Sequence, residues 1–346
     1  MIKIVVDAMG GDNAPGEIVK GCVEALAQDK EIGLILTGDE AKIKEELAKY
    51  KKVDTSRLEI VHCTQTIEMN DVPTEAIRKK RDSSLVVAFK KLKEDEEVQG
   101  LVTAGSTGAT LACGLFNLGR IRGVKRPALC PAIPNVHGKQ TLLCDCGANA
   151  EVKPIMLLQF AVMASAYAKI ALHVEDPKVA LLNNGTEEHK GDPLRQETYQ
   201  LLQKTKGIRF TGNAEGRDIM LGDADVVVAD GFSGNIALKS MEGCGKLVLS
   251  VMKKEFKSSP FSLFGALCAS GAIKRMKKQL DFDRYGGALL LGVKKVVIKS
   301  HGSSKAKAIV PSILMAAEAA RKNLVSEIEK MLEAADLENL LPKEEA

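Results

Sequence analysis

The sequence predicts an α/β protein in which helices cover a mostly parallel β-sheet. Short runs rich in β-branched residues alternate with longer segments of helical periodicity along most of the chain, and this alternation is typical of βαβ units. Polar loops that contain glycine follow six of the short runs. The 346 residues are enough for one large α/β domain or for two domains, and the length alone does not choose between them.

Nine strands are predicted from these runs. The first, IKIVVDA at residues 2–8, opens the chain and leads directly into a glycine-containing loop. A helical pattern generally resumes a few residues after each strand, as a crossover connection requires. In chain order, the other eight predicted strands are residues 32–38, 58–63, 99–105, 128–134, 140–146, 178–184, 225–231 and 296–302.

Six of the predicted strands end in loops rich in small polar, charged and glycine residues. In a parallel sheet such loops gather at the carboxyl edge, where ligands bind. The needs of a tight turn and a helix N-cap are enough to explain any one loop of this composition. Six such loops on one edge of the sheet instead indicate a binding crevice. The loops are residues 9–15, 105–110, 147–154, 183–191, 230–235 and 300–307.

The loop GSTGAT, residues 105–110, is the strongest single indication of a ligand. Gly105 and Gly108 let backbone N–H groups approach an anion, Ser106 and Thr107 add hydroxyl donors, and a helix beginning here directs its positive end at the same point. Neither the pattern GxxxxGK[ST] nor a strand-GxGxxG-helix fingerprint occurs in the sequence. We therefore expect a small phosphate here, with no nucleotide and no cofactor.

Composition excludes several classes of protein. A net charge of +4 and the lack of Trp argue against nucleic-acid binding, because little charge and few rings are available for phosphates and bases. The eight cysteines form no CxxC pair, and Cys144 and Cys146 lack the two further ligands of a zinc site. We therefore expect no metal site. No signal peptide and no run of 18 apolar residues is evident, so we also expect no membrane span.

Seven motifs, in this order along the chain, resemble those of the bacterial phosphate acyltransferase family of phospholipid synthesis. Several long motifs in one order are more specific than any one of them, and the resemblance covers roughly residues 1 to 325. The motifs are VVDAMGGDNAPGEIVKG, VPTEAIRKKRDSSLVVA, GLVTAGSTGAT, CDCGANAEVKP, LLNNGTEEHKG, DVVVADGFSGNIALKS and SHGSS.

The resemblance implies a three-layer α/β/α sandwich, related to phosphotransacetylases and isopropylmalate-type dehydrogenases. It implies one catalytic domain over residues 1–330, a polar tail over 331–346, and a homodimer. The activity it implies converts acyl-[acyl-carrier-protein] and inorganic phosphate into acyl phosphate. It further implies a cytoplasmic enzyme, peripherally associated with the inner face of the cell membrane, that supplies a membrane-bound glycerol-3-phosphate acyltransferase.

Phosphate is already charged at neutral pH, so positioning and charge stabilisation should dominate the chemistry. We expect the loop at residues 105–110 to hold the phosphate, the opening loop to form one wall of the site, amides to stabilise the oxyanion, and His301 to protonate the thiolate. Carboxylates would orient these donors or cap helices. The candidates for catalysis are Lys190, Asn183, Asn184, Asn235 and His301, and those for substrate binding are Asp7, Gly10, Gly11, Asp12, Gly105, Ser106, Thr107, Gly108, Asp230 and Lys239.

Four other interpretations remain open at this point. A covalent route through an acyl-cysteine would need a thiol beside a base. A nicotinamide-linked dehydrogenase would need a dinucleotide fingerprint or a metal-binding carboxylate set. A non-catalytic scaffold at a membrane surface would need only an apolar anchor. A phosphotransacetylase-like enzyme acting on acyl-CoA is the nearest enzymatic alternative.

The basic run in AIRKKRDSS is a candidate docking surface for the acidic carrier protein. It consists of Arg78, Lys79, Lys80 and Arg81. A solvated helix face would have the same composition.

Residues 236–280 are predicted to form a protruding helical hairpin with an apolar tip that faces the membrane. The two helices would span roughly 236–257 and 271–280, and basic clusters flank the tip on both sides. Such an apolar tip marks either a membrane contact or a dimer contact. The tip residues are Phe261, Leu263, Phe264 and Leu267.

Overall fold

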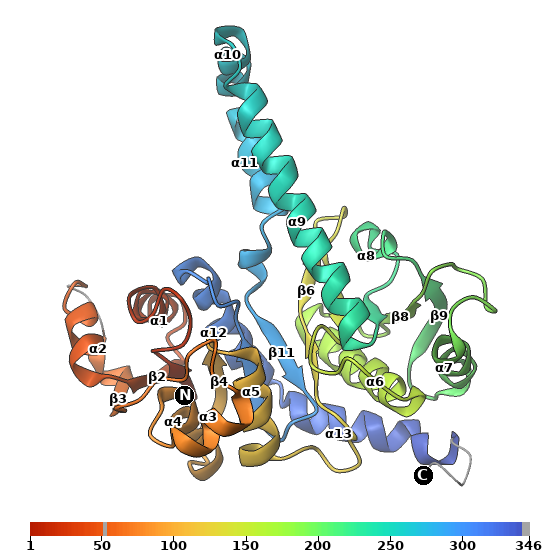
Figure 1. Cartoon of the computed structure of the whole chain (residues 1–346), viewed down its shortest axis with the longest axis horizontal. Helices are drawn as coiled ribbons and strands as arrows, with labels where there is room; N and C mark the ends of the chain where they lie inside the picture. The colour runs from red at the N-terminus through yellow and green to blue at the C-terminus, as the bar shows by residue number, and fades with distance from the viewer. Residues whose placement is uncertain (51–53, 341–346) are drawn as a thin grey trace.

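The computed structural model describes residues 1–50 and 54–340, and these form two mostly parallel sheets surrounded by helices (Figure 1). The predicted fold class is therefore confirmed. In the seven-stranded sheet, only the pairings of β11 are antiparallel. In spatial order its strands are β3 (Leu58–His62), β2 (Ile32–Gly38), β1 (Ile2–Asp7), β4 (Val98–Thr103), β12 (Val296–Lys299), β11 (Ala288–Leu291) and β5 (Ala128–Cys130).

The five-stranded sheet is parallel except where β6 pairs with β7. In spatial order its strands are β6 (Ala132–Pro134), β7 (Gln140–Cys144), β10 (Val226–Val228), β8 (Lys178–Leu182) and β9 (Arg209–Ala214). The strand predicted over residues 128–134 is in fact two strands, one in each sheet. Pro131 separates them, since a residue without an N–H cannot continue a ladder.

Helices cover both faces of the seven-stranded sheet. On one face α1 (Gly16–Gln28) and α12 (Ala306–Arg321) pack against alternate side chains such as Ile4 and Val6. On the other face α4 (Ser84–Glu94) and α5 (Thr107–Cys113) pack against Val5 and Leu101. Since a strand turns successive side chains to opposite faces, these buried strands are apolar on both. Two further helices, α2 (Glu40–Leu47) and α3 (Pro73–Lys79), lie beside this layer.

The helix α6 (Pro154–Ala171) packs on the second sheet and also contacts α12 and α13 (Leu324–Ala335). Fourteen of its 18 residues are buried, and one core cluster runs continuously from it to the first sheet. It is long and apolar enough to cross a bilayer, but most of it lies inside the protein, so it serves as the central core helix. The helix α7 (Pro193–Lys204) packs beside it.

On the opposite face of the second sheet lie α8 (Asp218–Leu221) and the start of α9 (Gly231–Phe256). From there α9 projects out of the body, and α10 (Pro260–Cys268) and α11 (Ser270–Gln279) return beside it (Figure 1). The predicted hairpin is present, but α9 begins five residues earlier than expected. The tip is itself a helix, because the Ser259 hydroxyl caps it and Pro260 suits its first position.

Two strands were not predicted. β11 is four residues long and is a short apolar run that a helix could equally contain, and β9 is half exposed and carries Gly212.

At the C-terminal end of the chain, residues 331–340 are not a free polar tail. They complete α13 and a short 3₁₀ turn (Leu337–Leu340) that bury Met331, Ala335 and Leu337, and residues 341–346 lie outside the described part. The boundaries of one catalytic domain stay a prediction.

Candidate functional site

A row of four polar side chains crosses the carboxyl edge of the seven-stranded sheet. Thr37 of β2 lies beside Asp7 of β1, and Thr103 of β4 lies beside Lys299 of β12. The Thr103 hydroxyl donates to the Asp7 carboxylate at 2.7 Å and joins the two pairs. All four residues are buried at the ends of otherwise apolar strands. Buried polar groups are costly unless they are bonded, so this row needs a reason.

Lys299 is the least satisfied member of the row. Its side chain is buried, and its ammonium donates to the carbonyl of Ser300. Among the described residues, no carboxylate lies within ion-pair distance of it. Burial lowers the pKa of Lys299 to about 8, while the more distant Asp7 opposes this shift. A buried cation with this environment favours an anionic ligand.

Asp7 is held by several donors and is not available as a free ligand. The Thr103 hydroxyl and the Met9 N–H donate to its carboxylate. Burial nevertheless raises the pKa of Asp7 above its ordinary value. We therefore interpret Asp7 as an orienting residue, which is one of the two roles expected for it.

The opening loop packs against two other strand ends. A Cβ at Gly10 would lie 2.7 Å from the Gly105 nitrogen, so only glycine permits this approach. Gly11 has φ +95° and lies against the Gly302 carbonyl, and the Asp12 N–H donates to that carbonyl at 2.8 Å. The predicted wall of the site is thus formed by three loops, from β1, β4 and β12.

The loop after β4 differs in detail from the expected phosphate cradle. The Gly105 N–H donates to the Thr103 hydroxyl, and Ser106 caps α5 through the Ala109 N–H. Gly108 is required for a different reason, since a Cβ there would lie 2.6 Å from Pro73 of α3. Thr107 begins the helix, and the N–H groups of a first turn have no partner within their helix. Ser106 and Thr107 therefore remain the better candidates of this loop.

His301 follows Lys299 by two residues. Its Nδ1 accepts from the Ser303 N–H at 3.2 Å and lies 2.8 Å from the Ser303 hydroxyl, so Nδ1 is engaged within its own loop and Nε2 is the ring nitrogen left for a ligand. Burial, and next the charge of Lys239, lower the pKa of His301 below its ordinary value. A largely neutral imidazole at pH 7 is a better hydrogen-bond donor to an oxyanion than a proton donor to a thiolate.

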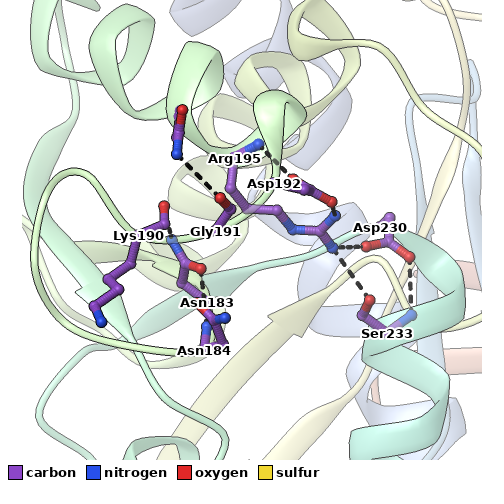
Figure 2. Close-up of polar contacts among 9 residues, drawn as sticks. Asn183, Asn184, Lys190, Gly191, Asp192, Arg195, Asp230 and Ser233 are labelled. Carbon is purple, nitrogen blue, oxygen red and sulfur yellow. Dashed lines mark hydrogen bonds and ion pairs between the residues drawn. The ribbon is translucent and has the colours of Figure 1, made fainter.

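A second group of candidates lies at the carboxyl edge of the other sheet (Figure 2). Asp230 caps α9 by accepting from the Ser233 N–H, and it also pairs with Arg195 of α7. The same guanidinium donates to the Ser233 hydroxyl at 3.1 Å and pairs with Asp192 at 2.7 Å. Asp230 therefore anchors the beginning of α9.

The loop of residues 183–191 is braced from within by Asn183. Its amide donates to the Lys190 carbonyl at 3.1 Å and accepts from the Asn184 N–H at 2.8 Å. This bracing leaves Asn183 poorly suited to the predicted oxyanion role. Asn184 is exposed, and the Lys190 side chain points away from Arg195 (Figure 2).

The loop of residues 147–154 is fixed by Asp145. That buried carboxylate accepts from the Leu129 N–H of the other sheet at 2.9 Å and from the Asn149 N–H at 2.8 Å. Burial raises the pKa of Asp145 to about 6. A Cβ added at Gly147 in this loop would lie 3.6 Å from the Asn235 side chain, so Asn235 lies beside the loop.

The helix α9 connects the two groups of candidates. It begins at the Asp230 cap and carries Lys239, whose charge acts on both Lys299 and His301. Lys239 itself pairs with Glu242 at 2.9 Å. Lys239 thus lies near the polar row, whereas Lys190 belongs to the second group.

The basic run at residues 78–81 is only partly available for docking. Lys80 pairs with Asp71 at 2.5 Å and donates to the Thr66 carbonyl, and Lys79 pairs with Glu75 at 2.7 Å. Arg78 and Arg81 are exposed and have no acidic partner within the described residues. Two of the four predicted docking cations are therefore free to meet a partner.

A cysteine nucleophile is poorly supported. Burial raises the pKa of Cys22, Cys63 and Cys113 to about 12, and it raises the pKa of Cys144 and Cys146 well above the ordinary value. Reactive cysteines have lowered pKa values. The exposed thiols of Cys244 and Cys268 lie on the hairpin helices.

Comparison with known proteins places the chain in a family. A protein-family model described as "Fatty acid synthesis protein" matches residues 2–327. A phosphate acyltransferase of Clostridioides difficile (strain 630) is 44% identical and covers 98% of each chain. The chain belongs to this phosphate acyltransferase family. Another phosphate acyltransferase, from Alkaliphilus oremlandii, is 48% identical over 89% of this chain and 90% of that one.

Solved structures agree on the fold. A phosphotransacetylase from Streptococcus pyogenes has a TM-score of 0.63 at 19% identity, with 93% of this chain and 94% of that one covered. The EutD phosphotransacetylase from Staphylococcus aureus has a TM-score of 0.59 at 19% identity, with 92% and 94% covered. Membership makes the chain an acyl-transfer enzyme of fatty acid and phospholipid synthesis, and the structures support its phosphotransacetylase-like architecture.

The sequence interpretation missed two residues of this acyltransferase. Lys299 falls within the predicted strand of residues 296–302, although a lysine inside the run VVIKSHG, next to a polar loop, is a detectable signal. Arg195 lies on a helix 35 residues before Asp230, and only the fold brings them together. Such a pairing has no local signal in the sequence.

Proposed function

We propose that this chain transfers the acyl group of an acyl-[acyl-carrier-protein] to inorganic phosphate and releases acyl phosphate and the free carrier. The product would supply a membrane-bound glycerol-3-phosphate acyltransferase in phospholipid synthesis. Family membership supports acyl transfer in lipid synthesis. The carrier thioester and the downstream partner are the further steps that the proposal adds.

The buried Lys299 is the observation that carries the proposal. It gives the carboxyl edge a cation that no carboxylate of residues 1–50 and 54–340 pairs with, beside the loops of Ser106 and His301. A phosphate oxyanion would supply the missing charge. Phosphate held here would lie among donors from three loops, as anion sites at a sheet edge do.

The reaction needs no covalent enzyme intermediate. A phosphate oxygen attacks the thioester carbonyl carbon, the carbonyl oxygen becomes an oxyanion, and the carbon–sulfur bond breaks as the carbonyl reforms. The Nε2–H of His301 would donate to the oxyanion, and the thiolate leaves to take up a proton from solvent. Hydrogen bonds of this kind are worth about 3–4 kcal/mol in the transition state.

The hairpin supports an additional role at a membrane surface, in which a cytoplasmic enzyme associates peripherally with the inner face of the cell membrane. Phe261 is 91% exposed and Phe264 68% exposed at its tip, and Leu263 and Leu267 are exposed beside them. Burying these four side chains in lipid would return about 6–12 kcal/mol before ordering costs. The flanking cations would add about 1 kcal/mol each on an anionic surface. They are Lys253, Lys254, Lys257, Lys274, Arg275, Lys277 and Lys278.

A homodimer is also part of the proposal. Besides the tip, α9 exposes Leu247, Val248 and Val251 along its length. A second copy of the chain could cover these side chains, since exposed apolar patches mark contact surfaces. Sedimentation velocity on the purified protein tests this part directly.

The decisive experiment uses purified protein, palmitoyl-[acyl-carrier-protein] and inorganic phosphate. We expect release of the free carrier thiol that depends on phosphate, with acyl phosphate as the second product. Palmitoyl-CoA under the same conditions tests the alternative of a phosphotransacetylase-like enzyme. Equal or better turnover of the CoA thioester would replace the carrier protein in the proposal, and no thiol release from either would reject it.

A further inference from the structure

A cavity of about 450 Å³ lies at the base of the hairpin, which we call the hairpin-base cavity. Its walls come from α9, the end of α11, the short 3₁₀ turn (Phe282–Tyr285) and the loop after β12. The last of these is the loop that carries His301. The cavity therefore adjoins the proposed acyl-transfer site at His301, and its size lies within the range of small-molecule pockets.

The floor of the hairpin-base cavity is apolar. Leu249 of α9, Leu280 and Phe282 line it and are half-buried. Phe282 also packs against the core cluster that contains Met241. The exposed charged residues Lys246, Lys277 and Asp283 stand at the rim. Two carboxylates of the lining, Glu242 and Asp281, are half-buried and pair with Lys239 and Lys307. An apolar floor with a charged rim suits an amphiphile.

Gly245 keeps one wall of the cavity bare. It is buried within α9, and an added Cβ would be no closer than 3.8 Å to Phe282 and 4.0 Å to the Leu280 carbonyl. Alanine would therefore fit and would favour the helix more than glycine does. The protein instead leaves this space unfilled, which indicates that something other than a side chain occupies it.

The polar end of the cavity matches the reacting end of an acyl compound. His301 lines it, and its Nε2 is the ring nitrogen left for a ligand, because Nδ1 is engaged by Ser303. The ammonium of Lys246 stands at the rim and, among the described residues, has no carboxylate within ion-pair distance. A carbonyl near His301 would place the chain that follows it over the apolar floor.

We propose that the hairpin-base cavity holds the long acyl chain of the substrate, with the carbonyl at His301 and the methyl end beside Leu249. Gly245 and Phe282 then limit the chain length that the enzyme accepts. The inference rests on the acyl transfer proposed above. It extends that function by assigning a site for chain-length selection.

The test fills the cavity from a single position. Gly245→Met should lower kcat/KM for palmitoyl-carrier at least tenfold, leave decanoyl-carrier within twofold and leave the KM of phosphate unchanged. Gly243→Met is the matched control, because Gly243 lies on the same helix, is exposed and has no atom within 4 Å of its added Cβ. Both thioesters should be used by this control within twofold of the wild-type rate.

The outcomes separate the two proposals. A wild-type enzyme that uses both thioesters, together with a Gly245→Met variant of unchanged palmitoyl-to-decanoyl ratio, would overturn the cavity assignment alone. A wild-type enzyme that uses neither thioester would reject the proposed function and this inference with it. If Gly245→Met does not fold, Phe282→Ala enlarges the same cavity and should shift the preference toward chains longer than palmitoyl, and an unshifted preference would reject the assignment.

Discussion

At the scale of single residues, Lys299 shows a conflict between stability and function. Its pKa of about 8, against 10.5 for an unperturbed lysine, means that keeping it charged costs the folded state about 3 kcal/mol at neutral pH. A ligand anion would offset this cost. Without such a ligand, a neutral side chain of similar length would suit the position better.

We therefore expect Lys299→Met to change stability and activity in opposite directions. The free energy of unfolding at pH 7, measured with urea, should rise by about 1–3 kcal/mol because the buried charge is removed. The kcat/KM for phosphate should fall by about a hundredfold or more. A variant that is less stable than wild type yet fully active would show that Lys299 is a structural residue.

The same pKa gives the stability difference a defined dependence on pH. Lys299 has a folded pKa lowered to about 8, so its penalty is complete below pH 8 and disappears as the pH rises toward 10.5. The gap in unfolding free energy between Lys299→Met and wild type should close over this window. A gap that stays constant from pH 7 to pH 10 would exclude burial of the charge as its cause.

Replacing Lys299 with arginine, which stays charged, should remove the dependence of activity on the titration of Lys299. Above about pH 8 Lys299 becomes neutral, and we expect kcat/KM for phosphate to decline in the wild type. Lys299→Arg remains charged at all these values and should lack that decline, even if its rate is lower. The ionisation of phosphate affects both proteins equally, so an identical alkaline limb in both would count against Lys299.

At the scale of elements, the apolar helix α10 is the clearest exposed feature. Replacing Phe261, Leu263, Phe264 and Leu267 together with Ser should abolish cosedimentation with phosphatidylglycerol vesicles, since the apolar contact with lipid is lost. Turnover of a soluble short-chain thioester should be unchanged. Phe116→Ser is the control, because Phe116 is 63% exposed on another element, and it should sediment like wild type.

The oligomeric state of the variant with four Ser substitutions in α10 distinguishes a membrane contact from a dimer contact. A dimer that no longer binds vesicles supports a membrane contact. A monomer that still sediments with vesicles would identify α10 as a dimer contact and reject the membrane role.

Most elements could be predicted from the sequence, because buried strands and glycine-containing loops leave local patterns. The hairpin was predicted from its apolar centre and basic flanks, and six of the seven strands of the first sheet were predicted approximately, with β5 joined to β6. Pro131 divided one strand, and β11 was too short to distinguish from a helix. The site was harder, since the Thr103 contact with Asp7 and the Arg195 contact with Asp230 join residues far apart in the chain.

At the scale of the whole molecule, the net charge of +4 is too small to steer an acidic carrier by itself, so a local patch must do so. Reversing the exposed pair Arg78 and Arg81 to Glu should raise the KM of the carrier thioester about tenfold and weaken its dependence on salt. The KM of phosphate should not change. Lys80 is left intact because its pair with Asp71 supports the fold.

Arg122 and Lys125 provide the matched control for this prediction. Both are exposed on the loop after the π-helical turn (Gly114–Leu118), and reversing them changes the total charge by the same amount. If the two double variants raise the KM of the carrier equally, docking depends on total charge and not on residues 78 and 81.

The position of β12 has a consequence for how the protein is made. β12 lies between β4 and β11 in the first sheet, yet it is encoded near the end of the chain, about 200 residues after β4. At a synthesis rate of about 5–20 residues per second, the growing chain spends roughly 10–40 s with the edge of β4 unpaired. That edge is a template for pairing with other chains. The nascent protein should therefore depend on a chaperone until residues 296–299 emerge from the ribosome, and only then can Lys299 join the polar row at the sheet edge.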